Sequence, residues 1–135
     1  MNQRVGQCAG TVFMVQPAAF AFNAQTAASN PLQASASVDS STTQLARAEF
    51  AGLAQALQSE GVRTIIGADT PEPAKPDAIF PNNWVSFHAD GTVVLYPMHA
   101  ANRRTERRRE VVDAVAEQSG FRITRVLDLS PHERE

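Results

Sequence analysis

An acid and two adjacent amides stand close together in the middle of the chain. Asp77 is followed by Asn82 and Asn83 within the stretch PDAIFPNNW. A carboxylate beside two amides can bind a planar, N–H-rich group through several directed hydrogen bonds. Guanidinium and ureido groups are such targets, which makes these residues candidates for a ligand site. The alternative is that the three residues only shape a turn, because Asp and Asn are common in turns.

Five arginines follow further along the chain, at positions 103, 104, 107, 108 and 109. Their number suggests a site for an anion or a phosphate. Positive side chains at the start of a helix oppose its macrodipole, which favours a specific role for one of them. The alternative is a solvated charged face, because Glu106 and Glu110 can pair with the other arginines.

The thiol and imidazole side chains give weaker signals. Cys8 is the only cysteine, and no histidine or acid stands near it in the sequence, so we expect a buried or incidental thiol. His88, His99 and His132 show no spacing typical of metal ligands. The chain has no glycine-rich phosphate loop, and neither a metal nor a cofactor is expected.

Length and composition indicate one soluble globular domain over residues 1–135, with residues 1–9 as a loose N-terminal arm. The chain is 43% hydrophobic and 19% charged, with a net charge of -2. This charge and the few interleaved aromatic residues argue against nucleic acid as a partner. No apolar run approaches the roughly 20 residues of a membrane span, and no signal peptide is recognisable, so the cytoplasm is the expected compartment.

Strands and helices alternate along the sequence, which predicts an α/β or α+β fold. Continuous apolar runs predict buried strands over residues 10–16, 62–66 and 121–127. Helices are expected over residues 41–60 and 103–119, and a long loop over residues 18–40.

Local signals set the limits of these elements. Ser41 and Gln44 resemble a capping box, and Gly61 and Gly120 stand where helix C-terminal caps belong. One face of the first helix is predicted to carry four apolar residues: Leu45, Phe50, Leu53 and Leu57.

A hairpin is predicted directly after the two amides. Strands are expected over residues 84–88 and 92–96, joined by a two-residue turn at Asp90-Gly91. Trp84, Phe87 and Tyr96 are assigned to the hairpin core rather than to a ligand site. The polar cluster therefore lies at the mouth of the hairpin, where strands can hold it still.

Four motifs in order carry a family resemblance: FAFNAQTAASN over residues 20–30, PDAIFPNNWVSF over 76–87, YPM over 96–98 and RRTERR over 103–108. In combination they resemble the arginine deiminase-related branch of the amidinotransferase, or guanidino-group modifying, superfamily, and within it the citrulline hydrolase-like group. The resemblance covers residues 13–130.

The resemblance implies a pentein-like fold, a five-bladed α/β propeller of which this chain forms about two ββαβ blades. It implies a small-molecule substrate that carries a guanidino or ureido group, such as an arginine- or citrulline-like amino acid. It also implies hydrolysis or transfer through a covalent Cys adduct, aided by a His and an acid. Neither nucleic acid nor membrane is expected as a partner, and homo-oligomer formation stays open.

Site roles also follow from the resemblance, position by position. Asp77 matches the acid that contacts the polar end of the substrate, and Arg103 matches an arginine that binds the substrate carboxylate. Asn82 and Asn83 stand where arginine-type hydrolases carry Glu and Asp. Asn23 matches the mobile loop over the site. Because an amide both donates and accepts hydrogen bonds, the two asparagines favour a neutral ureido group over a guanidinium.

The catalytic Cys, His and acid of the family have no counterparts among these residues, and Cys8 stands at the wrong end of the chain. We therefore expect the N-terminal portion of a hydrolase that is inactive by itself. Two alternatives remain: a non-catalytic remnant that binds a small ligand or a protein, and an α/β module unrelated to the family.

Overall fold

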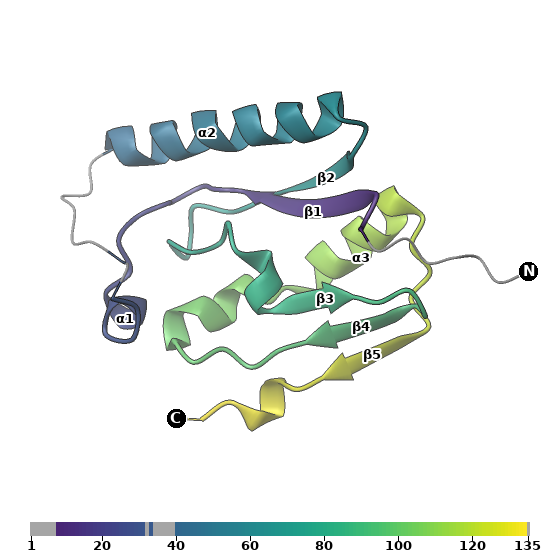
Figure 1. Ribbon diagram of the computed structural model, residues 1–135. Helices are drawn as coiled ribbons and strands as arrows, with labels where there is room; N and C mark the ends of the chain where they lie inside the picture. The colour runs from purple at the N-terminus through teal and green to yellow at the C-terminus, as the bar shows by residue number, and fades with distance from the viewer. Residues whose placement is uncertain (1–7, 32, 34–39, 135) are drawn as a thin grey trace, which may run out of the picture.

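The computed structural model describes residues 8–31, 33 and 40–134, and they form two β-sheets with helices between and beside them (Figure 1). Residues 1–7 of the expected N-terminal arm and most of residues 32–39 of the expected loop lie outside the described residues. The strands are β1 (Thr11–Gln16), β2 (Arg63–Ala68), β3 (Val85–Phe87), β4 (Thr92–Leu95) and β5 (Arg125–Asp128). The α-helices are α1 (Ala24–Ala27), α2 (Ser40–Ser59) and α3 (Arg109–Ser119), and the 3-10 helices are η1 (Pro81–Asn83), η2 (Ala101–Glu106) and η3 (Ser130–His132).

The first sheet is a parallel pair of β1 and β2, in register from Thr11 opposite Arg63 to Gln16 opposite Ala68. Parallel neighbours need a crossover connection, and α2 supplies it. Figure 1 shows α2 lying along one side of this pair. Both strands therefore end at the same edge of the sheet, and the chain leaves β1 there toward α1.

The second sheet has the order β3-β4-β5, with β3 antiparallel and β5 parallel to β4. Here α3 is the crossover, and it also packs against β2 of the first sheet. The main core lies between α3 and the second sheet, where Trp84, Val93 and Val112 are almost completely buried. Helices combined with one parallel and one mixed sheet agree with the expected α/β or α+β class. None of the described helices is long and apolar enough to cross a membrane.

The hairpin forms as expected, but its turn has three residues instead of two. His88 N–H donates to Thr92 O, and Gly91 N–H donates back to His88 O. Gly91 has a φ of 84°, and every described residue with a positive φ is a glycine. A two-residue type I′ turn would need Asp90 at a positive φ as well, so the chain uses the longer loop that ends in a left-handed glycine.

The helix predicted over residues 103–119 is wrong as a single element. The chain forms η2, passes through Arg107 and Arg108 in extended backbone, and then starts α3. The side chains of these two arginines reach acids in other segments, Glu133 and Asp69, which a continuous helix would not present in this way. The apolar face of α3 and its left-handed cap at Gly120 are confirmed.

The predicted face of α2 is partly wrong. Leu45 and Leu53 are 63% and 55% exposed, whereas Ala54 is 5% exposed. The buried side of the helix thus includes small Ala54, whereas two of the four predicted apolar residues face outward. Ser41 is the second helical residue, so it is not the expected cap.

The cap predicted at Gly61 is confirmed. Gly61 has a φ of 80°, and Val62 N–H donates to Leu57 O in the pattern that ends many helices.

The strands predicted over residues 10–16, 62–66 and 121–127 are less buried than expected. Ile66 of β2 is 41% exposed and Leu127 of β5 is 43% exposed. Val15 is the one fully buried residue of β1 and Ile65 that of β2, and β5 has none among its described residues.

The assignment of aromatic residues to the hairpin core is confirmed for two of the three: Trp84 is 1% exposed, and Phe87 packs edge-on against Phe121. Tyr96 is half-buried, and its hydroxyl shares a hydrogen bond with Ser86 Oγ.

Candidate ligand site

A polar pocket of about 390 Å³ opens where the chain leaves β1 and where the segment after β2 turns into η1. Nine residues line it: Phe20, Ala21, Thr26, Asn30, Gln33, Asp77, Phe80, Asn83 and Arg103. Three of the five predicted site residues, Asp77, Asn83 and Arg103, are therefore brought together. They come from two segments that are separated by the whole hairpin, so their proximity is a product of the fold.

Asp77 uses one carboxylate oxygen inside the protein. Its Oδ2 accepts hydrogen bonds from Asn23 Nδ2 at 2.7 Å and from Thr26 Oγ1 at 3.2 Å. Arg103 Nε lies 3.8 Å from the same oxygen. No described residue donates to the other oxygen, Oδ1. Asp77 therefore offers one acceptor and a negative charge to the pocket.

Arg103 is held by several groups at once. Its Nε and Nη2 donate to the two carboxylate oxygens of Glu106, both at 2.9 Å. Its Nη1 donates to Asn83 Oδ1 at 2.8 Å. The two-pronged pair with Glu106 fixes the plane of the guanidinium. No described residue accepts the second Nη1 hydrogen.

Glu106 is the buried counter-charge of this site, since its side chain is 1% exposed. Burial raises the pKa of Glu106 above the ordinary glutamate value, although the Arg103 guanidinium favours its ionised form. The carboxylates of Asp77 and Asp69 act in the same direction as burial. The charge of Arg103 is thus largely balanced from within the protein.

Asn23 lies behind the pocket rather than on its wall. It is 1% exposed and caps α1 by accepting the Gln25 N–H through its side chain. Its Oδ1 also accepts from Asn102 Nδ2, and its Nδ2 donates to Asp77. The residue is therefore placed to orient Asp77.

The two adjacent asparagines face different spaces. Asn83 lines the polar pocket, whereas Asn82 lines a separate groove between β1 and β3. Both residues belong to the right-handed η1 turn and have ordinary backbone angles. A 3-10 turn rotates successive side chains by about 120°, which sends the two amides in different directions.

The five arginines each pair with an acid in the described structure. Arg103 pairs with Glu106, Arg104 and Arg107 with Glu133, Arg108 with Asp69, and Arg109 with Asp113. Four of the five are at least partly buried, and only Arg109 is exposed. The interpretation as a solvated face is therefore wrong for all except Arg109.

A buried lysine, which the sequence analysis missed, shapes the loop before Asp77. Lys75 is 2% exposed, and its Nζ donates to Thr70 O, Thr70 Oγ1 and Pro73 O at 2.7 to 3.0 Å. The same Nζ lies 3.3 Å from Asp69 Oδ1. A lysine inside a proline-broken loop was the available signal, because such a loop exposes carbonyls that an ammonium can bind.

The thiol and imidazoles lie away from the pocket. Cys8 is exposed and precedes β1, while the pocket lies beyond the far end of that six-residue strand, about 20 Å away. His88, His99 and His132 are exposed and do not line the pocket. Within the described residues no cluster of three potential ligands could hold a metal ion.

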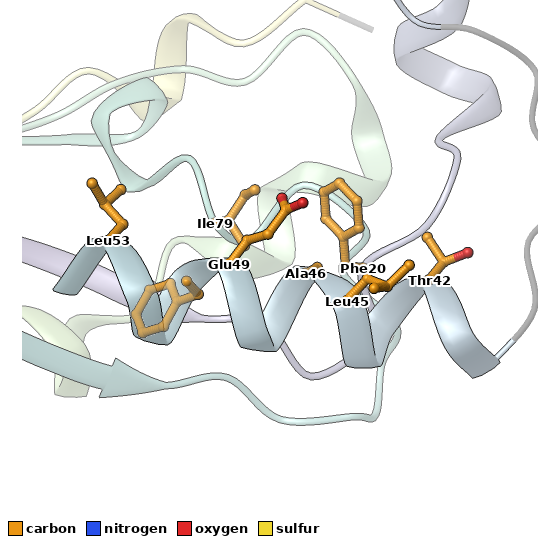
Figure 2. A pocket seen from close by; sticks show the side chains of 8 residues that line it. Phe20, Thr42, Leu45, Ala46, Glu49, Leu53 and Ile79 are labelled. Carbon is orange, nitrogen blue, oxygen red and sulfur yellow. The ribbon is translucent and has the colours of Figure 1, made fainter. Parts of the chain in front are cut away.

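A second hollow, of about 410 Å³, lies beside α2 (Figure 2). Figure 2 shows Leu45, Glu49 and Leu53 projecting from the helix, with Phe20 and Ile79 across from them. Glu49 is its only charged lining residue. This hollow suits apolar groups, so the polar pocket is the better candidate for a guanidino or ureido ligand.

Comparison with protein families gives one match. The family described as N,N dimethylarginine dimethylhydrolase, eukaryotic, matches residues 16–135, which include the polar pocket and its surrounding elements. The chain belongs to this family. It is thereby a member of the arginine-related, guanidino-group modifying superfamily that its motifs resembled. No curated protein and no solved structure matches the sequence.

Proposed function

We propose that this chain supplies the substrate-recognition part of a hydrolase that acts on a guanidino or ureido amino acid. The observation that carries the proposal is the polar pocket, where no described residue pairs with Asp77 Oδ1, Asn83 Nδ2 or the second Nη1 hydrogen of Arg103. An amino acid with a polar side-chain end has groups that match all three. The family description supports this class, since dimethylarginine carries a guanidino group.

Asp77 accepts N–H groups from the polar side-chain end of the ligand in this proposal, and Arg103 binds the carboxylate. Asp77 has an unshared acceptor in a half-enclosed pocket, where a charge-assisted hydrogen bond is stronger than in water. Arg103 is already oriented by Glu106, so little side-chain entropy is lost when a carboxylate binds.

Asn83 favours a ureido over a guanidinium group. Its Oδ1 is occupied by Arg103, which can only donate, so the orientation of the amide is fixed and Nδ2 is the free group. An N–H donor complements the carbonyl of a ureido group. A guanidinium presents only donors, and it would leave two donors facing each other. We therefore propose citrulline-like over arginine-like ligands.

The catalytic step is proposed to use a Cys, a His and an acid outside these 135 residues. The family resemblance implies a covalent Cys adduct, and Cys8 lies about a strand length from the pocket, which is too far for attack on a ligand bound there. The chain alone should then release neither ammonia nor ornithine from arginine or citrulline. Release above the rate of a Cys8→Ala control would overturn the assignment.

We propose that the whole enzyme is a propeller. Residues 1–135 would form a single domain of it, with about two blades. The β3-β4-α3-β5 unit has the ββαβ order of one blade, and β1-α2-β2 has a shortened form of it. The pocket lies beside both units. A cytoplasmic location is part of the same proposal, and homo-oligomer formation stays open.

The test is a calorimetric titration of the chain and of Asn83→Asp with L-citrulline, L-arginine and N,N-dimethylarginine. The native chain should bind citrulline more tightly than arginine. Asn83→Asp should reverse that order, because a carboxylate replaces the free donor with an acceptor and a negative charge. Tighter binding of arginine by the native chain would contradict the ureido preference, and binding of none of the three would contradict the recognition site.

A further inference from the structure

Two asparagines from distant segments form a reciprocal amide pair behind the pocket. Asn102 Nδ2 donates to Asn23 Oδ1 at 2.8 Å, and Asn23 Nδ2 lies 3.4 Å from Asn102 Oδ1. Other partners fix which end of the Asn23 amide is which. Its Oδ1 also receives the Gln25 backbone N–H, which can only donate, and its Nδ2 faces the Asp77 carboxylate, which accepts.

Asn23 has no hydrogen-bonding capacity left for a ligand. Both hydrogens of Nδ2 and both lone pairs of Oδ1 have partners within the protein, and the residue is 1% exposed. Its shortest contact, at 2.7 Å, is the one to Asp77 Oδ2. The amide therefore acts on the carboxylate and through it on the pocket.

Asn102 connects the helix that Asn23 caps to the segment that carries Arg103. Its backbone N–H donates to Gln25 Oε1 at 2.9 Å, in addition to the side-chain pair. Asn102 and Arg103 are neighbours in η2. A chain of contacts through Asn23 and Asn102 therefore connects the two recognition residues, Asp77 and Arg103.

We infer that the Asn23–Asn102 pair positions Asp77, so that Oδ2 is held inward and Oδ1 is the oxygen presented to the ligand. Asn102 does not line the pocket and acts only through Asn23. The ligand-related part of this inference rests on the proposed function. The structural part, a coupling between Asn102 and Asp77, does not.

The first test measures solvent exchange of side-chain amide protons in the ¹H–¹⁵N spectrum of the full 135-residue chain. The Asn23 amide should exchange at least about tenfold more slowly than that of an exposed residue such as Gln55, because hydrogen-bonded, buried amides are protected. Asn102→Ala should reduce the protection, since it removes the Oδ1 acceptor of one Asn23 Nδ2 hydrogen. The isosteric Asn102→Asp should reduce it too, because it replaces the donor to Asn23 Oδ1 with a carboxylate oxygen that repels it. Fast exchange in the native chain would overturn the inference.

The second test is a double-mutant cycle of Asn102→Ala and Asp77→Asn, read from urea unfolding. The effects should be non-additive by at least about twofold in the unfolding equilibrium constant, although no direct hydrogen bond joins the two residues. The matched control is Thr105→Ala, which removes another η2 hydrogen bond, to Asn102 O, and should be additive with Asp77→Asn. Additivity of Asn102→Ala as well would contradict the coupling.

A citrulline titration then connects the pair to the pocket. Asn102→Asp should weaken binding at least about fivefold relative to Thr105→Ala. Equal affinities of these two variants would overturn the positioning role. If the native chain shows amide protection and coupling but no binding, the proposed function fails while the pair stands, so the two failures are distinguishable.

Discussion

Arg103 and Glu106 form the most enclosed ion pair of the polar pocket, with side chains 11% and 1% exposed. Burial raises the pKa of Glu106, which means that the protein retains this carboxylate against a desolvation penalty. Its compensation is the two-pronged contact that fixes the Arg103 guanidinium. At the scale of single residues, the pocket-lining Arg103 is thus held in place by Glu106, which does not line the pocket.

Removal of Arg103 should therefore be costly for folding. Arg103→Gln is expected to lower the free energy of unfolding by about 3 kcal/mol, because it leaves Glu106 buried without its counter-charge. Urea unfolding at pH 7 measures this. Arg109→Gln is the control, since the Arg109–Asp113 pair is more than half exposed on both sides and should contribute less than about 0.5 kcal/mol. Equal losses in the two variants would contradict the assigned burial.

Glu133 predicts a dependence of stability on pH. Burial disfavours its ionised form, but hydrogen bonds from Arg107 and the Met98 N–H and the charges of Arg107 and Arg104 outweigh this and lower the pKa of Glu133. A lowered pKa stabilises the fold above the ordinary value of 4.5 and loses that effect as the pH falls through the folded-state value.

Glu133→Gln should accordingly lower the melting temperature at pH 7. The difference from the native chain should shrink as the pH falls from about 4.5 through the lowered folded-state pKa, below which the native side chain is protonated too. Thermal melts at pH 7, 5, 4 and 3 check this. A difference that stays constant down to pH 3 would show that Glu133 contributes through packing instead of charge.

The hairpin turn is the element whose geometry places the most demand on one residue. A Cβ at Gly91 would lie 2.6 Å from Arg122 O, and the φ of 84° is itself unfavourable for other residues. Thr124 N–H also donates to Gly91 O, so the turn is tied to the segment that leads into β5. The turn thus sets the register of all three strands of the second sheet.

Gly91→Ala should lower the free energy of unfolding by about 2 to 4 kcal/mol, from the left-handed backbone and the steric clash together. Gly120→Ala is the matched control, because Gly120 has a φ of 75° but nothing within 4 Å of its Cβ position. It should lose only about 1 kcal/mol. Chemical denaturation measures the free energy of unfolding of both variants. An equal loss in both would mean that the steric clash with Arg122 O does not contribute to the destabilisation.

The sequence predicted most elements but not how they pack. Gly61 and Gly120 gave correct helix ends because a left-handed cap is a local property. The break at Arg107 and Arg108 could not be predicted, because their partners Glu133 and Asp69 are distant in the sequence. The face of α2 was also predicted wrongly, because periodicity favours large leucines, whereas Leu45 and Leu53 are exposed and small Ala54 is buried.

At the scale of the whole molecule, two sheets share α3, and the polar pocket lies beside both of their units. Asp77, Asn83 and Arg103 were predictable because their motifs are distinctive and resemble one superfamily. Asn102, Glu106 and Lys75 were not, because their roles depend on partners that only the fold brings near. The separation of Asn82 from Asn83 also needed the fold, since adjacent residues on a short 3-10 turn diverge.

The central claim is that Asp77 is the acidic contact of a pocket for guanidino or ureido amino acids. Calorimetric titration of L-citrulline into the native chain and into Asp77→Asn, each first shown to melt cooperatively, tests it most directly. The account predicts saturable binding by the native chain and at least about tenfold weaker binding by Asp77→Asn, because the variant lacks the charge that Oδ1 presents. Equal binding by both chains, or none by a cooperatively folded native chain, would contradict it.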